Sequence, residues 1–218
     1  MVPQARSEAT RQKILNAAID LFSEVGYAAA GLGEIIERAG MTKGALYHHF
    51  ESKEALATAI IEQGSNLTRD AFGRVCESSS PALENMIHGA FVVTDLLVSD
   101  KTARTADQLT RGLAEFNSAA SRVWSSRLDA ITTQARRASA EGDLREGLDP
   151  YVVSESILNG MLGAQLLSKT AHGNDHIKRL TRSLELLLPA IVADTSLAYF
   201  REFLARESLR QPTGHPIS

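Results

Sequence analysis

Cysteine, tryptophan, proline and long apolar runs are all scarce in this sequence. Cys76 is the only cysteine among 218 residues, so no disulfide can form within the chain. No stretch approaches the ~20 apolar residues of a membrane helix. The first residues have no apolar run after a basic start, so we expect no signal peptide and a cytoplasmic protein.

The usual signatures of catalysis and metal binding are also missing. There is no glycine-rich phosphate loop after a strand, no nucleophile elbow and no Cys/His pairing. His48 and His49 are adjacent, so on a helix they diverge by ~100° and cannot bind one metal ion together. The other histidines are scattered. We therefore expect no enzyme, no cofactor and no metal site.

Apolar residues make up 44% of the chain and recur at helical spacing, with no convincing strand. The pattern predicts an all-α protein with a three-helix head and a body of six or seven helices. The expected domains are a head at residues 1–53, a helical body at 54–210 and a disordered tail at 211–218, with a flexible arm over residues 1–6. The expected helices span about 7–25, two short segments within 32–50, then 52–75, 81–97, 102–113, 116–140, 152–169, 177–188 and 195–207.

The two short segments form a predicted helix-turn-helix. Gly40 separates two apolar stripes, and a glycine just after a periodic segment can take the left-handed conformation that ends a helix. Thr42 is a natural cap for the second helix. The first stripe consists of Leu32, Ile35, Ile36 and Ala39, and the second of Leu46 and Phe50.

The second of these helices leaves a polar face outside that suits a DNA groove. Lysines can neutralise phosphates, hydroxyls can reach phosphate oxygens or base edges, and a glycine lets the backbone approach the bases. The residues expected to contact DNA are Thr42, Lys43, Gly44, Tyr47, His48 and Lys53.

The overall charge of the chain contributes little attraction for DNA. The net charge is −3, and basic and acidic side chains are equal in number over residues 1–53. Neutralisation of phosphates normally supplies most non-specific affinity for DNA. We therefore expect weak non-specific binding and reliance on two specific half-sites.

The stretch from Thr42 to Phe50, followed by Ser-Lys-Glu-Ala-Leu at 52–56, resembles the recognition helix and next helix start of the tetracycline-repressor (TetR) family. Thr10-Arg11, Leu21-Phe22 and Gly26-Tyr27 are similar to that family's first helix and its exit. Gly31 stands where the family usually has a threonine, and it brings no hydroxyl for a phosphate. The resemblance implies a transcriptional repressor that binds a palindromic double-stranded operator as a homodimer.

A two-fold dimer must place its recognition helices about 34 Å apart to meet successive major grooves. We predict an isologous four-helix interface made by the helix after Pro150 and the helix before Pro189. Glycines permit close helix approach, and leucines supply apolar area. The residues expected at this interface are Gly160, Gly163, Ala164, Leu184, Leu187 and Leu188.

The resemblance also implies that a small molecule enters the body and releases the protein from DNA. The sequence from Lys43 to Gln63 and the run Leu186–Pro189 are similar to the γ-butyrolactone autoregulator receptors, which implies a small lipophilic effector of butyrolactone type. Trp124 offers a flat wall, and two amides in a nearly all-apolar helix need partners. The expected ligand contacts are Phe91, Trp124, Asn159, Met161 and Gln165.

Two other functions fit parts of the sequence. One is a helical module that binds proteins, since the head is electrically neutral and lacks the usual threonine at position 31. The other is a DNA-binding regulator without a small-molecule ligand. Retention of Lys43, Gly44, Tyr47 and Lys53 favours DNA binding over the first of these.

Overall fold

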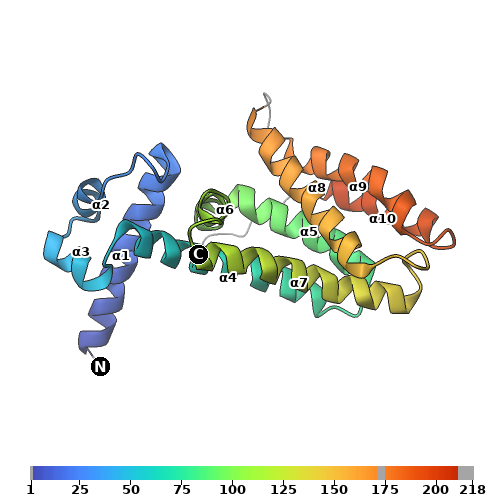
Figure 1. The fold of residues 1–218 in the computed structure, drawn as a ribbon, viewed down its shortest axis with the longest axis horizontal. Coiled ribbons are helices and arrows are strands. Elements are labelled where there is room, and N and C mark those ends of the chain that lie inside the picture. The colour runs from blue at the N-terminus through green and yellow to red at the C-terminus, as the bar shows by residue number, and fades with distance from the viewer. Residues whose placement is uncertain (1, 171–174, 211–218) are drawn as a thin grey trace. The chain divides into compact units, whose positions relative to one another are not determined.

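The computed structural model describes residues 2–170 and 175–210, and the regular elements in that part of the chain are helices, which confirms the predicted all-α class (Figure 1). The only extended pairing within the described residues is an isolated bridge between Leu144 and Val192. The helices are α1 (Val2–Val25), α2 (Leu32–Ala39), α3 (Lys43–His49), α4 (Lys53–Cys76), α5 (Ala82–Ser99), α6 (Lys101–Leu113), α7 (Ser118–Glu141), α8 (Pro150–Thr170), α9 (His176–Ile191) and α10 (Leu197–Leu209).

Three local expectations were wrong. Helix α1 begins at Val2, so residues 2–6 are helical and not an arm. Helix α9 continues through Pro189 to Ile191, because a proline in the last turn removes only one N–H donor and the next N–H groups still bond, as Val192 N does to Leu188 O. Phe116, which the predicted helix at 116–140 includes, precedes α7 and is 81% exposed. The predicted disordered tail lies outside the described residues.

The chain divides into two compact units. Unit 1 comprises residues 1–68 and 97–123, and unit 2 comprises residues 69–96 and 124–218. Unit 1 therefore contains the predicted three-helix head together with most of α4, α6 and the start of α7. Helix α4 is covalently continuous from one unit into the other. Among the described residues no helix combines the length and apolar character that a membrane span requires.

Helix α1 is the centre of unit 1, since α2, α3 and α6 all pack against it. Its apolar positions recur every three or four residues, which places them on one buried face. That face meets the few large side chains that α2 and α3 turn inward. The buried cluster includes Ile14, Leu15, Ala18, Leu21 and Phe22 of α1 with Ile35, Leu46, Phe50, Leu56 and Ile60.

Helices α4 and α6 cross at Gly64. A Cβ built there would lie 2.3 Å from the Ala106 Cβ and 2.9 Å from the Thr102 carbonyl oxygen, so only glycine fits. A second link runs through Asn117, whose Nδ2 donates to Thr58 Oγ1 at 2.8 Å. The Asn117 Oδ1 accepts from the first free amides of α7. Close packing at Gly64 therefore joins α4 to α6, and the Asn117 side chain joins α4 to the start of α7.

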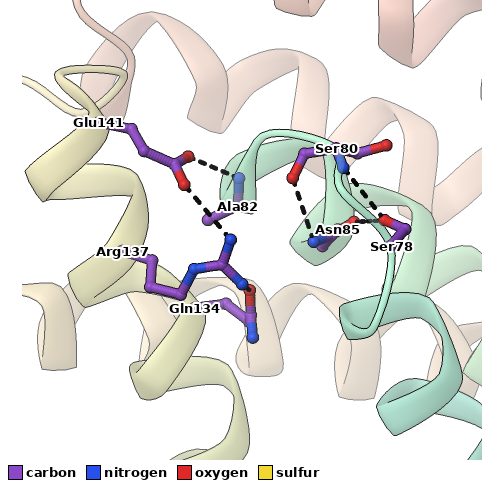
Figure 2. Close-up of polar contacts among 7 residues, drawn as sticks. All are labelled: Ser78, Ser80, Ala82, Asn85, Gln134, Arg137 and Glu141. Carbon is purple, nitrogen blue, oxygen red and sulfur yellow. Dashed lines mark hydrogen bonds and ion pairs between the residues drawn. The ribbon is translucent and has the colours of Figure 1, made fainter.

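Unit 2 has its own apolar core, built from α5, α7, α8, α9 and α10, with α9 lying between α8 and α10 (Figure 1). Figure 2 shows how the connection into α5 is held. The Ser78 hydroxyl donates to Asn85 Oδ1, and the Asn85 Nδ2 donates to Ser80 O. The Glu141 carboxylate of α7 accepts from Ala82 N at 2.7 Å and so caps α5 from another helix.

Two glycines of α4 give opposite predictions. We expect Gly64→Ala to destabilise the protein by about 1–3 kcal/mol, because the methyl group overlaps the backbone of α6. Gly73→Ala meets nothing within 4 Å, so it is expected to stabilise by about 0.5–1 kcal/mol through the better helix propensity of alanine. Thermal and urea denaturation of the two variants measure both effects. Equal destabilisation by both changes would contradict the steric explanation.

Candidate nucleic-acid interface and effector site

Helices α2 and α3 form the predicted helix-turn-helix. Helix α2 ends at Gly40, which has a left-handed backbone (φ 62°, ψ 37°), and the Met41 and Gly40 amides donate to the Ile36 and Glu37 carbonyls. Thr42 then caps α3, since its Oγ1 accepts from Ala45 N at 3.1 Å. Both ends of the turn therefore have their backbone groups satisfied, and the turn holds α3 in one orientation.

Helix α3 buries Leu46 completely and is followed by buried Phe50. The opposite face is exposed and carries five of the residues expected to contact DNA: Thr42, Lys43, Gly44, Tyr47 and His48. The Lys43 ammonium lies 5.9 Å from the centre of the Tyr47 ring, so a cation and an aromatic hydroxyl are presented side by side. A short helix with a cationic, hydroxyl-bearing and glycine-containing outer face can enter a major groove.

The start of α2 has an unusual cap. Gly31 provides no side-chain hydrogen bond to the first turn, as the sequence indicated. In compensation the Glu34 carboxylate accepts from Gly31 N at 2.9 Å. Farther along, Arg38 of α2 donates to both carboxylate oxygens of Glu24 at 2.7 and 2.8 Å and so fastens α2 to α1. This hydrogen bond lowers the pKa of Glu24.

Lys53, the sixth residue expected to contact DNA, is occupied within the protein. Its Nζ donates to the carbonyl oxygens of Tyr27 and Ala30 at 2.8 Å and of Ala28 at 3.3 Å. The same ammonium lies 4.6 Å from the centre of the Tyr27 ring. Burial, followed by the charge of Glu54, raises the pKa of Tyr27. Backbone carbonyls in a turn have no sequence signature, so the residue pattern alone could not show this arrangement.

The five side chains expected to meet an effector are not all in the interior of unit 2. Phe91 and Met161 are buried in the core cluster, and Gln165 is buried as well. Trp124 is half-buried, with the Arg127 guanidinium 5.1 Å from its ring. Asn159, also expected to contact the ligand, is exposed on α8. Because α8 is apolar on nearly every side, its periodicity did not distinguish the inner face of the helix from the outer face.

Thr94 of α5 is a buried polar residue that was not among the ligand contacts predicted from the sequence. Its side chain is 0% exposed, and its Oγ1 has no hydrogen-bond partner. The Thr105 hydroxyl of α6, in unit 1, is also buried without a hydrogen-bond partner. Every other buried serine or threonine of the described residues donates to a carbonyl three or four residues back: Thr68, Thr110, Thr132, Ser154 and Ser168. A buried hydroxyl without a partner is costly, so Thr94 is a candidate contact for a bound polar group.

The residues expected at a dimer interface are mostly used inside unit 2. Ala164, Leu184 and Leu188 belong to its buried core, and Leu187 packs partly against it. A Cβ at Gly160 would meet Ser183 Oγ at 2.6 Å, so this glycine serves the crossing of α8 and α9 within one chain. Only Gly163 opens onto free space.

Other apolar side chains of α8 and α9 are exposed instead. Leu166 and Leu167 of α8 are 52% and 55% exposed, and Leu186 of α9 is 83% exposed. These exposed side chains lie on two helices that pack against each other, whereas the core leucines are used within unit 2.

Metal chemistry has no support in the described part of the chain, where no group of three or more His, Cys, Asp and Glu side chains can hold an ion. His88 is instead a structural residue. Its Nδ1 lies 2.7 Å from the buried Glu207 carboxylate, which also pairs with Arg210 at 2.9 Å. This cluster joins α10 to α5.

Residues 14–60 match the family described as "Bacterial regulatory proteins, tetR family". The A-factor receptor protein of Streptomyces griseus is 27% identical over 202 residues, which cover 92% of this chain and 70% of that protein. The crystal structure of a γ-butyrolactone receptor (ArpA-like protein) is similar with a TM-score of 0.77 at 28% identity, covering 93% of this chain and 98% of the other. The TetR family protein CprB of Streptomyces coelicolor, in complex with its biological operator sequence, matches with a TM-score of 0.77 at 26% identity over 93% of this chain and all of that chain (100%).

The exposed α3 face predicts the effect of removing one charge. Lys43→Met is expected to weaken binding to duplex DNA and to lower the slope of log affinity against log salt by about 0.9, the value for one phosphate contact. Lys178→Met removes an exposed lysine from unit 2 and should change neither quantity. Fluorescence anisotropy at several salt concentrations measures both. An unchanged slope for Lys43→Met would remove this lysine from the interface.

Proposed function

We propose that this chain, a transcriptional regulator of the tetR family, binds a palindromic operator as a homodimer, represses transcription there, and is released by a small lipophilic effector. Its fold and its matched relatives are those of regulators and not of enzymes. The observation that carries the proposal is the exposed face of α3, held on a fully capped helix-turn-helix.

The DNA step depends on specific contacts more than on charge. Lys43 supplies a phosphate contact, and Tyr47 and His48 reach farther into the groove from the same face. Because residues 1–53 carry no net charge, one head alone has little attraction for the phosphate backbone. Two heads joined by a two-fold axis double the number of contacts and require a palindromic site.

The dimer step is assigned to the exposed leucines of α8 and α9. Leu166, Leu167 and Leu186 lie on helices that pack against each other within unit 2. An isologous contact of this pair with the same pair of a second chain forms a four-helix interface and covers apolar surface that would otherwise face water.

The effector step rests on unit 2 and on the relatives. Proteins named as receptors for A-factor and for γ-butyrolactone match most of this chain. Phe91 and Met161 supply apolar contacts, and the Thr94 hydroxyl supplies one polar contact. This combination fits a molecule that is mainly lipophilic and carries a carbonyl or hydroxyl. Such a ligand shifts the equilibrium when it binds better to the form that cannot bind DNA.

The deciding experiment is a selection of genomic fragments by the full-length protein at a stated salt concentration. The bound fragments are then challenged with a lipid extract of the source organism's culture. We expect a palindromic sequence that the extract releases. A selected site that no extract releases would leave a DNA-binding regulator without this class of effector. Failure to select any site would overturn the proposed function as a whole.

The dimer assignment predicts the effect of one exposed charge. Leu186→Glu is expected to shift the protein from dimer to monomer at micromolar concentration, because a carboxylate would be buried in the interface. Leu209→Glu is the matched control, since Leu209 is 82% exposed but lies on α10. Sedimentation velocity measures both. If both variants remain dimeric, the contact lies elsewhere.

The buried threonines give a second matched pair. Thr94→Val and Thr105→Val each remove a buried hydroxyl without a partner, so both are expected to leave stability unchanged or slightly raised. Only Thr94→Val should make the protein harder to release from the selected DNA site. We expect it to need about ten times more culture extract than wild type, which corresponds to the loss of one hydrogen bond of ~1.4 kcal/mol. Equal responses of the two variants would remove Thr94 from the effector site.

A further inference from the structure

We infer that Lys53 controls DNA binding as a positioning residue that clamps the turn before α2, and not as a phosphate contact. This inference rests on the proposed DNA interface and concerns how that interface is held. It also departs from the expectation drawn from the sequence, which placed the Lys53 ammonium on the DNA backbone.

The ammonium group has no donor left over. A lysine Nζ carries three N–H groups. They meet three carbonyl oxygens, those of Tyr27 and Ala30 at 2.8 Å and of Ala28 at 3.3 Å. The centre of the Tyr27 ring also lies 4.6 Å from this nitrogen, within the range of a cation–π contact. A phosphate would have to displace one of these partners before it could bind.

The clamped turn is the segment that sets the start of the helix-turn-helix. It begins at Gly26, whose backbone is left-handed (φ 83°), and Ala30 N closes it by donating to Gly26 O at 3.2 Å. Ala30 is buried, and α2 begins two residues later at Leu32. Because Gly31 has no side chain to cap α2, the hold on the Ala30 carbonyl fixes the entry of the chain into that helix.

On the other side of the clamp, Lys53 is the first residue of α4. Ser52 caps this helix, since its Oγ accepts from Ala55 N at 3.1 Å and its carbonyl accepts from Leu56 N. The first turn of α4 is therefore rigid, and a movement of that turn displaces the three carbonyls with it. Through Lys53, the position of α4 is linked to the position of α2.

The chemistry of the site explains why arginine would not serve as well. The three carbonyls converge on one nitrogen, which matches a tetrahedral ammonium with three donors. A guanidinium is planar and directs its donors outward in a fork, a geometry that suits a phosphate. A lysine that only touched phosphate would therefore be replaced well by arginine, whereas a lysine in this clamp would not.

The first test uses the free full-length protein and needs no DNA. Amide hydrogen exchange over residues 27–35 is compared in wild type, Lys53→Met, Lys53→Arg and the control Lys43→Met. We expect exchange in this segment to rise about tenfold in both Lys53 variants and to stay unchanged in Lys43→Met. Unchanged exchange in both Lys53 variants would overturn the clamp. Thermal denaturation shows whether each variant is folded, and Lys53→Arg keeps the test open if Lys53→Met is not.

The second test measures binding of a mixed-sequence duplex and of the selected operator at several salt concentrations. Lys53→Met should weaken operator binding about tenfold with the salt slope of wild type, and Lys53→Arg should not restore affinity. A slope lowered by about 0.9, with full affinity in Lys53→Arg, would make Lys53 a phosphate contact and overturn the inference. If wild type bound neither duplex, the proposed function would fail, and the hydrogen exchange result would still decide whether the clamp exists.

Discussion

The helix-turn-helix depends on the burial of a few side chains from two helices that are too short to form alone. Helices α2 and α3 have eight and seven residues, below the ~12–15 residues at which an isolated helix becomes even marginally stable in water. Ile35 and Leu46 are completely buried against α1, and each contributes roughly 1.5–3 kcal/mol. The turn between the helices adds capped ends. With so few inward side chains required, the rest of α3 is free to present polar groups outward.

Lys43 and Lys53 have different physical surroundings. Lys43 is exposed beside Tyr47 and keeps its donors for an external partner. Lys53 is half-buried, and its donors are used on three carbonyls of the turn before α2. Both residues are basic and both lie near the recognition helix in sequence. Their hydrogen-bond partners, and not their charge or position in a motif, distinguish the lysine proposed to contact DNA from the lysine proposed to hold the turn before α2.

Unit 2 shows the same separation among apolar and polar residues. Leu184 and Leu188 are core residues, whereas Leu186 on the same helix is 83% exposed. Among buried hydroxyls, Ser154 and Ser168 donate back along their own helix, whereas Thr94 does not. The proposed self-association surface and the proposed polar contact to an effector therefore lie on residues outside the set predicted from the sequence, while Phe91 and Met161 remain among the candidates.

The sequence by itself determined the helical class, the positions of nearly all helix ends and the outward face of α3. These features depend on periodicity and on caps within a few residues, such as Gly40 and Thr42, and such local effects are readable in a linear pattern. Only the tertiary structure decided that Lys53 binds the turn at residues 27–30, that Asn159 points outward and that Glu141 caps α5. The first and third depend on main-chain groups that are distant in sequence, and every residue type carries those groups. The second depends on how an apolar helix is rotated against its neighbours, which its residue types do not indicate.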